Sequence, residues 1–126
     1  MPRVLYVEDN ADNRMLVRRI LMAYDIDVDD TDDAARGIQM ALNDPPDLIL
    51  MDISMPGMDG LTATRKIRAL RELDAVPVVA LTANVREHDR QMTIEAGADG
   101  YIGKPIDVDK FPDQVLDFVR QGRQPI

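Results

Sequence analysis

The sequence predicts an α/β fold in which one doubly wound, five-stranded parallel sheet is covered by helices on both faces. Short apolar runs alternate with helix-period segments, which gives strands near 3–8, 26–30, 48–52, 76–81 and 100–103. The first, third and fourth runs are continuously apolar, as expected for parallel strands that helices bury on both sides. The length of 126 residues fits one compact domain, over 1–121, followed by a C-terminal tail at 122–126.

The second strand is the weakest of the five. Only Ile26 and Val28 are apolar there, and acidic residues surround them. Charges on a strand discourage pairing with another chain, so this pattern is typical of a sheet edge. We therefore expect the second strand at an edge.

The first helix is expected over 11–24. Spacing at 3.6 residues per turn directs one face of this helix inward, and that face contains Leu16, Val17, Ile20 and Asn13. Met15, Arg19 and Met22 then point away from the core. Exposed methionines suit adaptable contacts, so we hypothesise that these three residues dock a kinase or a phosphotransfer helix bundle.

The second and third helices are bounded by local signals. Thr31 or Asp32 can cap the second helix, which ends near Asn43 because Pro45 and Pro46 cannot continue it. The third helix is expected over 61–70.

The fourth helix is expected over 86–96, where Gly97 suits a left-handed cap. The fifth helix carries an apolar stripe of Phe111, Val115, Phe118 and Val119. Pro112 fits only in the first turn of this helix, which predicts a cap at Val108 or Asp109.

Composition narrows the classes of function. The chain has no cysteine, which excludes disulfides, zinc-thiolate sites and thiol catalysis. A formal net charge of −8 argues against direct nucleic-acid binding, which needs clustered Lys and Arg. No apolar run has the length of a membrane span, and the first residues lack a secretory signal, so we expect a cytoplasmic protein without membrane contact.

Polar side chains stand where the predicted strands end. Glu8 and Asp9 follow the first strand, and Asp52 closes the third, directly before a loop rich in Pro and Gly. If the strand order is 2-1-3-4-5, these three carboxylates meet at the carboxyl edge of the sheet, where open α/β folds bind ligands. The fourth strand then delivers Thr82 to this edge, and the fifth delivers Lys104.

Three carboxylates in one crevice require a cation. All three are ionised at pH 7 on reference pKa values of about 3.9 to 4.3, and two such charges ~4 Å apart cost about 4 kcal/mol near a protein surface. Hard oxygen ligands in an open crevice suit Mg²⁺, and Lys104 adds a positive charge suited to a phosphoryl oxygen. These residue types indicate a phosphoryl-transfer site with Asp52 as nucleophile.

The sequence resembles the receiver domain of two-component response regulators over nearly its whole length. The resemblance rests on residues 7–10, on Asp52 with the segment 55–60, on residues 81–83 and on residues 103–105, in the order and spacing of that family. It implies the flavodoxin-like (βα)5 fold and a phosphoprotein whose Asp52 accepts phosphate from a histidine kinase or a histidine phosphotransfer protein. A receiver is a signalling component of a phosphorelay. It catalyses only its own phosphorylation and dephosphorylation, so it is not expected to be an enzyme in any other sense.

The resemblance also implies roles for individual residues. Glu8, Asp9, Asp52 and the backbone carbonyl of Ser54 would arrange the Mg²⁺, directly or through water. Glu rather than a second Asp at position 8 is a common family variant, which would move that ligand to the outer shell. Thr82 would bond the phosphoryl group, Tyr101 would be the rotating aromatic of the switch, and the bond from Lys104 to Pro105 would be cis. The face formed by the fourth helix, fifth strand and fifth helix would contact a downstream protein target. Since the sequence stops after the fifth helix, we expect a single-domain regulator, although a receiver excised from a hybrid kinase has the same pattern.

Three other functions share parts of this pattern. A flavodoxin-like electron carrier needs a Ser-, Thr- or Gly-rich phosphate loop after the first strand, and residues 10–13 are not such a loop. A haloacid-dehalogenase-like phosphohydrolase needs a second aspartate where this chain has Ser54. A receiver-shaped docking module that works without phosphate keeps the fold and loses the chemistry; the retained acids and Lys104 argue against it.

Overall fold

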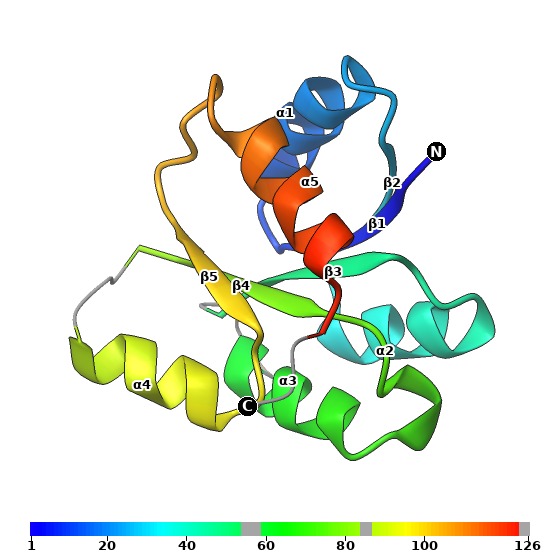
Figure 1. The fold of residues 1–126 in the computed structure, drawn as a ribbon, viewed down its shortest axis with the longest axis vertical. Coiled ribbons are helices and arrows are strands. Elements are labelled where there is room, and N and C mark those ends of the chain that lie inside the picture. The colour runs from blue at the N-terminus through cyan, green and yellow to red at the C-terminus, as the bar shows by residue number, and fades with distance from the viewer. Residues whose placement is uncertain (54–58, 84–86, 124–126) are drawn as a thin grey trace.

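A computed structural model describes residues 1–53, 59–83 and 87–123, apart from the side chains of residues 87 and 88 (Figure 1). Within these residues one parallel sheet contains β1 (Arg3–Val7), β2 (Asp27–Thr31), β3 (Leu48–Asp52), β4 (Val78–Thr82) and β5 (Gly100–Gly103). The helices are α1 (Ala11–Met22), α2 (Ala34–Asn43), α3 (Gly60–Arg68), the 3₁₀ helix η1 (Arg71–Leu73), α4 (Glu87–Glu95) and α5 (Phe111–Gln121). The strand order is β2-β1-β3-β4-β5, which confirms the predicted fold and the edge position of β2.

Helices cover both faces of the sheet, and alternate strand residues supply two cores. Figure 1 shows α1 and α5 on one side of the sheet and α2, α3 and α4 on the other. Tyr6 and Leu50 belong to the core under α1 and α5, whereas Val7 and Met51 belong to the core under α2 and α3. No helix in the described segments has the length and apolarity needed to cross a bilayer.

The register aligns the carboxyl ends of the strands. Val7 pairs with Met51, so Glu8 follows β1 beside the last residue of β3. Asp52 pairs with Leu81 of β4, and Thr82 pairs with Gly103 of β5. The polar residues at these strand ends therefore share one edge of the sheet.

The inward face of α1 differs from the prediction. Val17 and Ile20 are buried as predicted, but Leu21 is fully buried and Leu16 is 43% exposed. Residues 17, 20 and 21 follow the i, i+3, i+4 spacing of one helical face, and Leu16 lies to its side. Leu16 instead lines a cavity that also touches Lys104 and Ile106.

Two predicted helix caps were wrong. Asp33, not Thr31 or Asp32, caps α2, and its side chain accepts a hydrogen bond from the Ala35 amide at 3.0 Å. Thr31 remains in β2, where its carbonyl accepts from the Glu8 amide at 3.0 Å. At α5 the cap is Lys110, because Val108 and Asp109 belong to a preceding turn.

Other boundaries agree with the sequence signals. The α2 helix ends at Asn43, and Gly97 has the expected positive φ, 106°. Pro112 stands in the first turn of α5. Within the segment after α5, Arg123 donates through Nε to Asp99 at 3.1 Å and through Nη1 to the Asp74 carbonyl at 3.1 Å. Arg123 is therefore fixed at the end of the sheet that lies opposite the carboxylates.

Gly60 allows α3 to start directly against the end of β3. A Cβ at this position would lie 2.2 Å from the Asp52 carbonyl oxygen and 2.5 Å from the Ile53 Cα. Gly60→Ala should lower the free energy of unfolding by about 2 kcal/mol, because backbone atoms must move to accept the methyl group. Urea denaturation followed by circular dichroism measures this change.

Gly37→Ala in α2 is the matched control. Its Cβ would meet the Val7 Cγ2 methyl at 2.8 Å and the Thr31 Cγ2 methyl at 3.3 Å rather than backbone, and alanine favours the helix interior. We expect a loss below about 1 kcal/mol there. Equal losses at the two positions would contradict a backbone clash at Gly60.

Candidate functional site at the carboxyl edge of the sheet

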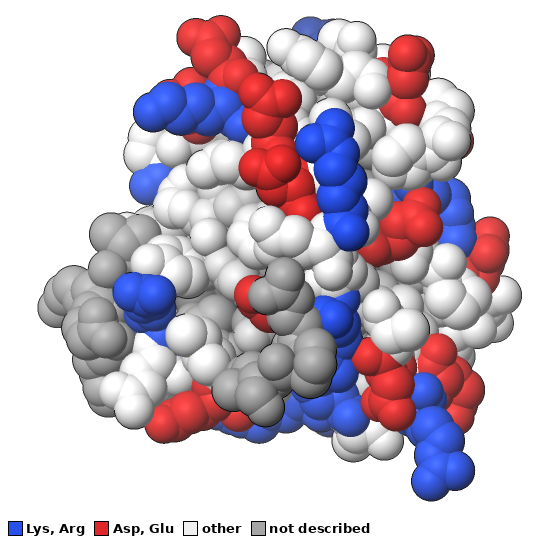
Figure 2. Space-filling model, viewed as in Figure 1, with Lys and Arg blue, Asp and Glu red and all other residues white. Residues whose placement is uncertain are grey.

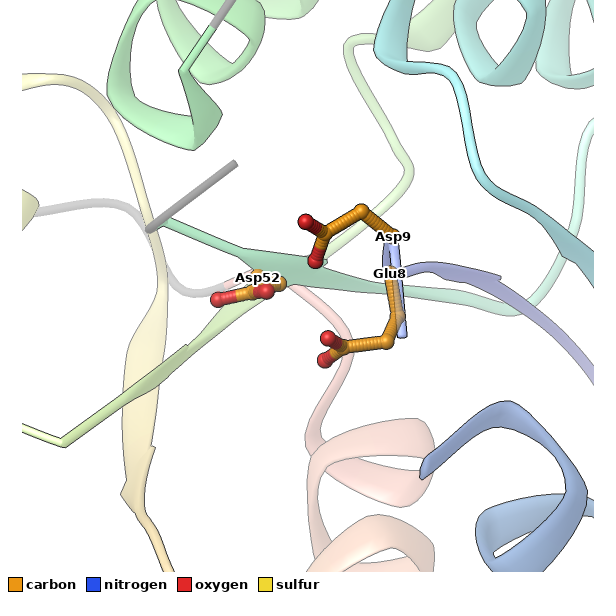
Figure 3. A group of neighbouring side chains, drawn as sticks. All are labelled: Glu8, Asp9 and Asp52. Carbon is orange, nitrogen blue, oxygen red and sulfur yellow. The ribbon is translucent and has the colours of Figure 1, made fainter. Parts of the chain in front are cut away.

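Three carboxylates converge at the end of β1 and β3. Glu8, Asp9 and Asp52 each offer an oxygen, and these oxygens lie within 4.8 Å of one another. Figure 3 shows the three side chains gathered around one space beside the strand ends. Glu8 and Asp52 are 1% and 2% exposed, whereas Asp9 is exposed to solvent. The three carboxylates thus meet at the predicted edge, with two acids buried in the protein and one facing water.

Lys104 places its ammonium group between the two buried acids. Its Nζ lies 3.1 Å from Glu8 Oε2 and 3.2 Å from Asp52 Oδ1. Burial lowers the pKa of Lys104, but the attraction of Asp52 and Glu8 outweighs burial and raises the pKa above its usual range. Lys104 is thus protonated at neutral pH, and the peptide bond to Pro105 is cis, as the resemblance implied.

Two side chains, Tyr6 and Arg14, and the backbone of Asn10 fix Glu8. The Tyr6 hydroxyl donates to Glu8 Oε2 at 3.0 Å, and the Asn10 amide donates to Glu8 Oε1 at 3.3 Å. Arg14 Nη1 donates to the Glu8 carbonyl at 2.7 Å, while its Nε lies 3.1 Å from Asp30. Burial, followed by the charge of Glu8, raises the pKa of Tyr6 far above its ordinary value, so the phenol keeps its proton. The signal for Tyr6 was its position two residues before Glu8, on the same face of the strand.

The remaining strand ends carry the other predicted residues. Thr82 ends β4 and is 3% exposed, and its carbonyl accepts from the Lys104 amide at 2.8 Å. Tyr101 is half-buried on β5, where it pairs with Ala80. The guanidinium of Arg90, on α4, lies 5.5 Å from the centre of the Tyr101 ring, within cation–π range. Sequence reasoning did not identify Arg90, because only the fold brings α4 over β5.

The loop after Asp52 is described only at its ends. Ser54, whose carbonyl was predicted to bind metal, lies outside the described residues, together with the segment 55–58. Asp59 accepts a hydrogen bond from the Thr62 amide at 2.8 Å and caps α3. The end of this loop is therefore anchored to α3.

A cavity and an exposed stripe flank the carboxylates on the α1 side. The cavity has a volume of about 370 Å³ and is lined by Tyr6, Asn13, Leu16, Ala83, Lys104, Pro105 and Ile106. Met15 and Met22 are 53% and 59% exposed, and Arg19 is exposed between them. All three predicted docking residues therefore reach solvent, and Leu16 on the same helix lines the cavity.

The donor set fits a hard divalent cation. It consists of carboxylate oxygens, and the exposed Asp9 leaves an approach for an ion that keeps part of its water shell, as Mg²⁺ does. A protonated lysine beside Asp52 suits an anionic group with several oxygens, such as a phosphoryl group. The site thus places the Asp52 carboxylate beside one cation, Lys104, among oxygen donors that suit a second cation.

Comparison with known proteins gives one family. A family model described as the response regulator receiver domain matches residues 4–116. The polar-differentiation response regulator DivK of Brucella anthropi is 34% identical over 120 residues, which cover 94% of this chain and 98% of DivK. The sensor protein GacS of Pseudomonas syringae is 36% identical over 118 residues, 91% of this chain, but the chain spans only 13% of the length of GacS.

Solved structures agree with these sequence matches. The receiver domain of the sensor histidine kinase PA1611 from Pseudomonas aeruginosa matches with a TM-score of 0.86 and 32% identity. The match covers 94% of this chain and 98% of the PA1611 domain. That structure was determined with a magnesium ion coordinated in its active-site cleft. The chemotaxis protein CheY4 of Vibrio cholerae shares the fold, with a TM-score of 0.88 over 93% of this chain and 98% of CheY4, at 24% identity.

Lys104→Met tests the role of the ammonium group in stability. The variant leaves Glu8 and Asp52 buried without their positive partner, so the free energy of unfolding at pH 7 in EDTA should fall by about 2 kcal/mol. Because the folded pKa of Lys104 is raised, its contribution is present in full below the unfolded value of 10.5 and is lost as pH rises through the folded pKa. The difference between wild type and variant should therefore stay constant from neutral pH to 10.5 and shrink above it.

Lys66→Met supplies the control, because Lys66 is an exposed lysine on α3. Urea unfolding of both variants over this pH range measures the effect. A loss at Lys104 no larger than the loss at Lys66 would show that the buried acids do not need this cation.

Proposed function

The chain belongs to the response regulator receiver domain family, and we propose that it accepts a phosphoryl group on Asp52 from a phosphorylated histidine. The donor would be a sensor histidine kinase or a histidine phosphotransfer protein. The observation that carries this proposal is the meeting of Glu8, Asp9 and Asp52 with the Lys104 ammonium group at one sheet edge. In this proposal the protein is a phosphoacceptor of a signalling relay, and the chemistry it catalyses is its own phosphorylation and dephosphorylation.

The transfer is a displacement at phosphorus. An Asp52 carboxylate oxygen forms the new P–O bond while the P–N bond to the donor imidazole breaks. The imidazole keeps the electron pair of that bond and leaves as a neutral ring with its other nitrogen protonated. Lys104, whose Nζ lies 3.2 Å from Asp52 Oδ1, would stabilise the negative charge of the phosphoryl oxygens.

Mg²⁺ is the cofactor that fits this site. Asp9, Asp52 and the Ser54 carbonyl would hold the ion, with Glu8 acting directly or through water; Ser54 lies outside the described residues. When bound, the ion supplies further positive charge to the phosphoryl oxygens. Asp9 contributes the solvent-facing ligand, and Asp52 is both ligand and nucleophile.

Phosphorylation would be transmitted through β4 and β5. The new group adds about −1.5 to −2 charges and strong acceptors near Thr82, whose hydroxyl would turn toward them. Tyr101 would then move inward and leave the Arg90 guanidinium, which now lies over its ring. The surface of α4, β5 and α5 changes as a result, and this surface would bind the downstream protein target.

Partner proteins would approach along α1. Met15, Arg19 and Met22 form one exposed stripe, and Leu16 extends it toward the cavity beside Lys104. A helix bundle lying on this stripe brings a phosphohistidine close to Asp52. We propose this stripe as the docking surface for the kinase or the phosphotransfer protein.

The relatives bear on whether this domain acts as a separate protein or within a larger kinase. DivK is matched nearly end to end, whereas GacS is matched over a small part of its length, so both a separate regulator and a receiver within a hybrid kinase fit the chain. On the face drawn in Figure 2, basic side chains are interspersed with acidic ones, and the net charge is −8. We therefore propose protein partners in the cytoplasm, with no direct nucleic-acid or membrane contact.

Asp52→Asn should abolish labelling by a phosphodonor. Wild-type protein incubated with acetyl phosphate and Mg²⁺ is expected to gain about 80 Da on the peptide that contains Asp52, and the amide of the variant cannot form the acyl phosphate. Intact-mass and peptide mass spectrometry measure the adduct. Asp29→Asn on the exposed side of β2 should label like the wild type. Unlabelled wild type would favour a docking module that works without phosphate.

Met15→Asp should slow phosphotransfer from a protein donor without affecting acetyl phosphate. Transfer from an autophosphorylated histidine kinase that labels the wild type should fall roughly tenfold or more, because a charge replaces an apolar contact at the interface. Radiolabel transfer over time gives the rate. Met92→Asp, at an exposed methionine on α4, should leave the rate unchanged. An unchanged rate for Met15→Asp would remove α1 as the docking surface.

A further inference from the structure

Tyr6 places a hydroxyl group beneath the carboxylates from inside the core. The residue is 0% exposed and packs among the apolar side chains under α1 and α5. A buried phenol requires a hydrogen-bond partner, and here the hydroxyl donates to Glu8 Oε2 at 3.0 Å. The core thus contacts the site through one directional hydrogen bond.

The hydrogen bonds of Glu8 use most of its accepting capacity. Oε2 accepts from Tyr6 and lies 3.1 Å from Lys104 Nζ, while Oε1 accepts from the Asn10 amide at 3.3 Å. A carboxylate has about four lone-pair sites, so roughly one remains, on Oε1. Because the donors come from the core, the β1–α1 junction and the loop after β5, Glu8 cannot turn toward an ion without breaking one of these bonds.

Asp9 differs from Glu8 in this respect, because its side chain is exposed to solvent. Asp52 contacts the same ammonium group through its Oδ1. Mg²⁺ keeps several waters and takes one or two carboxylates, whereas Ca²⁺ takes six to eight oxygens and accepts bidentate carboxylates. A third carboxylate that is free to turn would therefore help Ca²⁺ more than Mg²⁺.

We propose that Tyr6 is a positioning residue that holds Glu8 out of direct contact with the cation and thereby makes the site selective for Mg²⁺ over Ca²⁺. In this arrangement, the remaining lone pair of Glu8 accepts a hydrogen bond from a metal-bound water. The inference rests on the proposed function, since it refines the metal site used for phosphorylation. It assigns a specificity role to a core residue that touches neither the metal nor the phosphoryl group.

Tyr6→Phe tests the role directly, because it removes the hydroxyl and keeps the ring in the core. Isothermal titration of metal-free protein with Mg²⁺ and with Ca²⁺ gives both dissociation constants. We expect the ratio of the Ca²⁺ constant to the Mg²⁺ constant to fall roughly 3- to 10-fold, the effect of about one hydrogen bond. Tyr24→Phe, at a tyrosine that is 51% exposed, should leave the ratio unchanged. An equal change in both constants, or none, overturns the proposal, because packing damage weakens both ions alike.

A double-mutant comparison tests whether Tyr6 acts through Glu8. In a Glu8→Ala background the carboxylate is absent, so adding Tyr6→Phe should no longer change the ratio. A change of the same size in that background would show that Tyr6 acts by another route.

Wild-type protein offers a measurement that needs no variant. In ¹³C-labelled protein, the side-chain carboxyl signals of Asp9 and Asp52 should move more on Mg²⁺ addition than the signal of Glu8. A Glu8 shift as large as theirs would mean direct coordination and overturn the proposal.

Labelling by acetyl phosphate separates this inference from the proposed function. If the wild type is labelled and binds Mg²⁺, but Tyr6→Phe leaves the ratio of the Ca²⁺ and Mg²⁺ dissociation constants at the wild-type value, only the proposed role of Tyr6 fails. If the wild type neither binds Mg²⁺ nor becomes labelled, both proposals fail together.

Discussion

The structure of the site depends on one interaction, in which the Lys104 ammonium group lies between the buried carboxylates of Glu8 and Asp52. Glu8 and Asp52 are almost completely inaccessible, and burying two like charges side by side is strongly unfavourable without an opposite charge. Lys104 supplies that charge from a position 96 residues beyond Glu8. The site therefore exists only after the first and last strands have joined the same sheet, which makes the electrostatics of the site part of the stability of the fold.

Lys104 also connects the site to the surfaces around it through its backbone. The Lys104 amide bonds the Thr82 carbonyl, so β4 and the loop after β5 are joined at the point where a phosphoryl group would lie. On the neighbouring strand, Tyr101 lies under Arg90 of α4. In the proposed function, a change of charge at Asp52 would act first on Lys104, which contacts Asp52 and bonds the Thr82 carbonyl.

The α1 side of the site is fixed by a second set of bonds. Arg14 bonds the Glu8 carbonyl and Asp30, and the Asn10 side chain caps α1 by accepting from the Asn13 amide at 3.0 Å. The first turn of α1 is consequently held against the acid that Tyr6 and Lys104 also hold. A partner that binds along α1, as proposed, would therefore meet a fixed edge beside Asp52, with the cavity lined by Leu16 and Lys104 within its reach.

The sequence alone predicted the α/β class, because the alternation of apolar strands with helix-period segments is a local property of the chain. The strand order 2-1-3-4-5 was an assumption that the family resemblance supported, and under it Glu8, Asp9, Asp52 and Lys104 were expected to meet at one edge. Local signals also predicted the end of α2 at Asn43 and the left-handed Gly97, where Pro and Gly restrict the backbone. Sequence could not choose Leu21 over Leu16 for the core, since both are leucines and only the placement of α1 on the sheet buries one of them. Nor could it reveal the bond from Tyr6 to Glu8 or the contact from Arg90 to Tyr101, because a buried aromatic and a surface arginine are ordinary until packing brings each within reach of its partner.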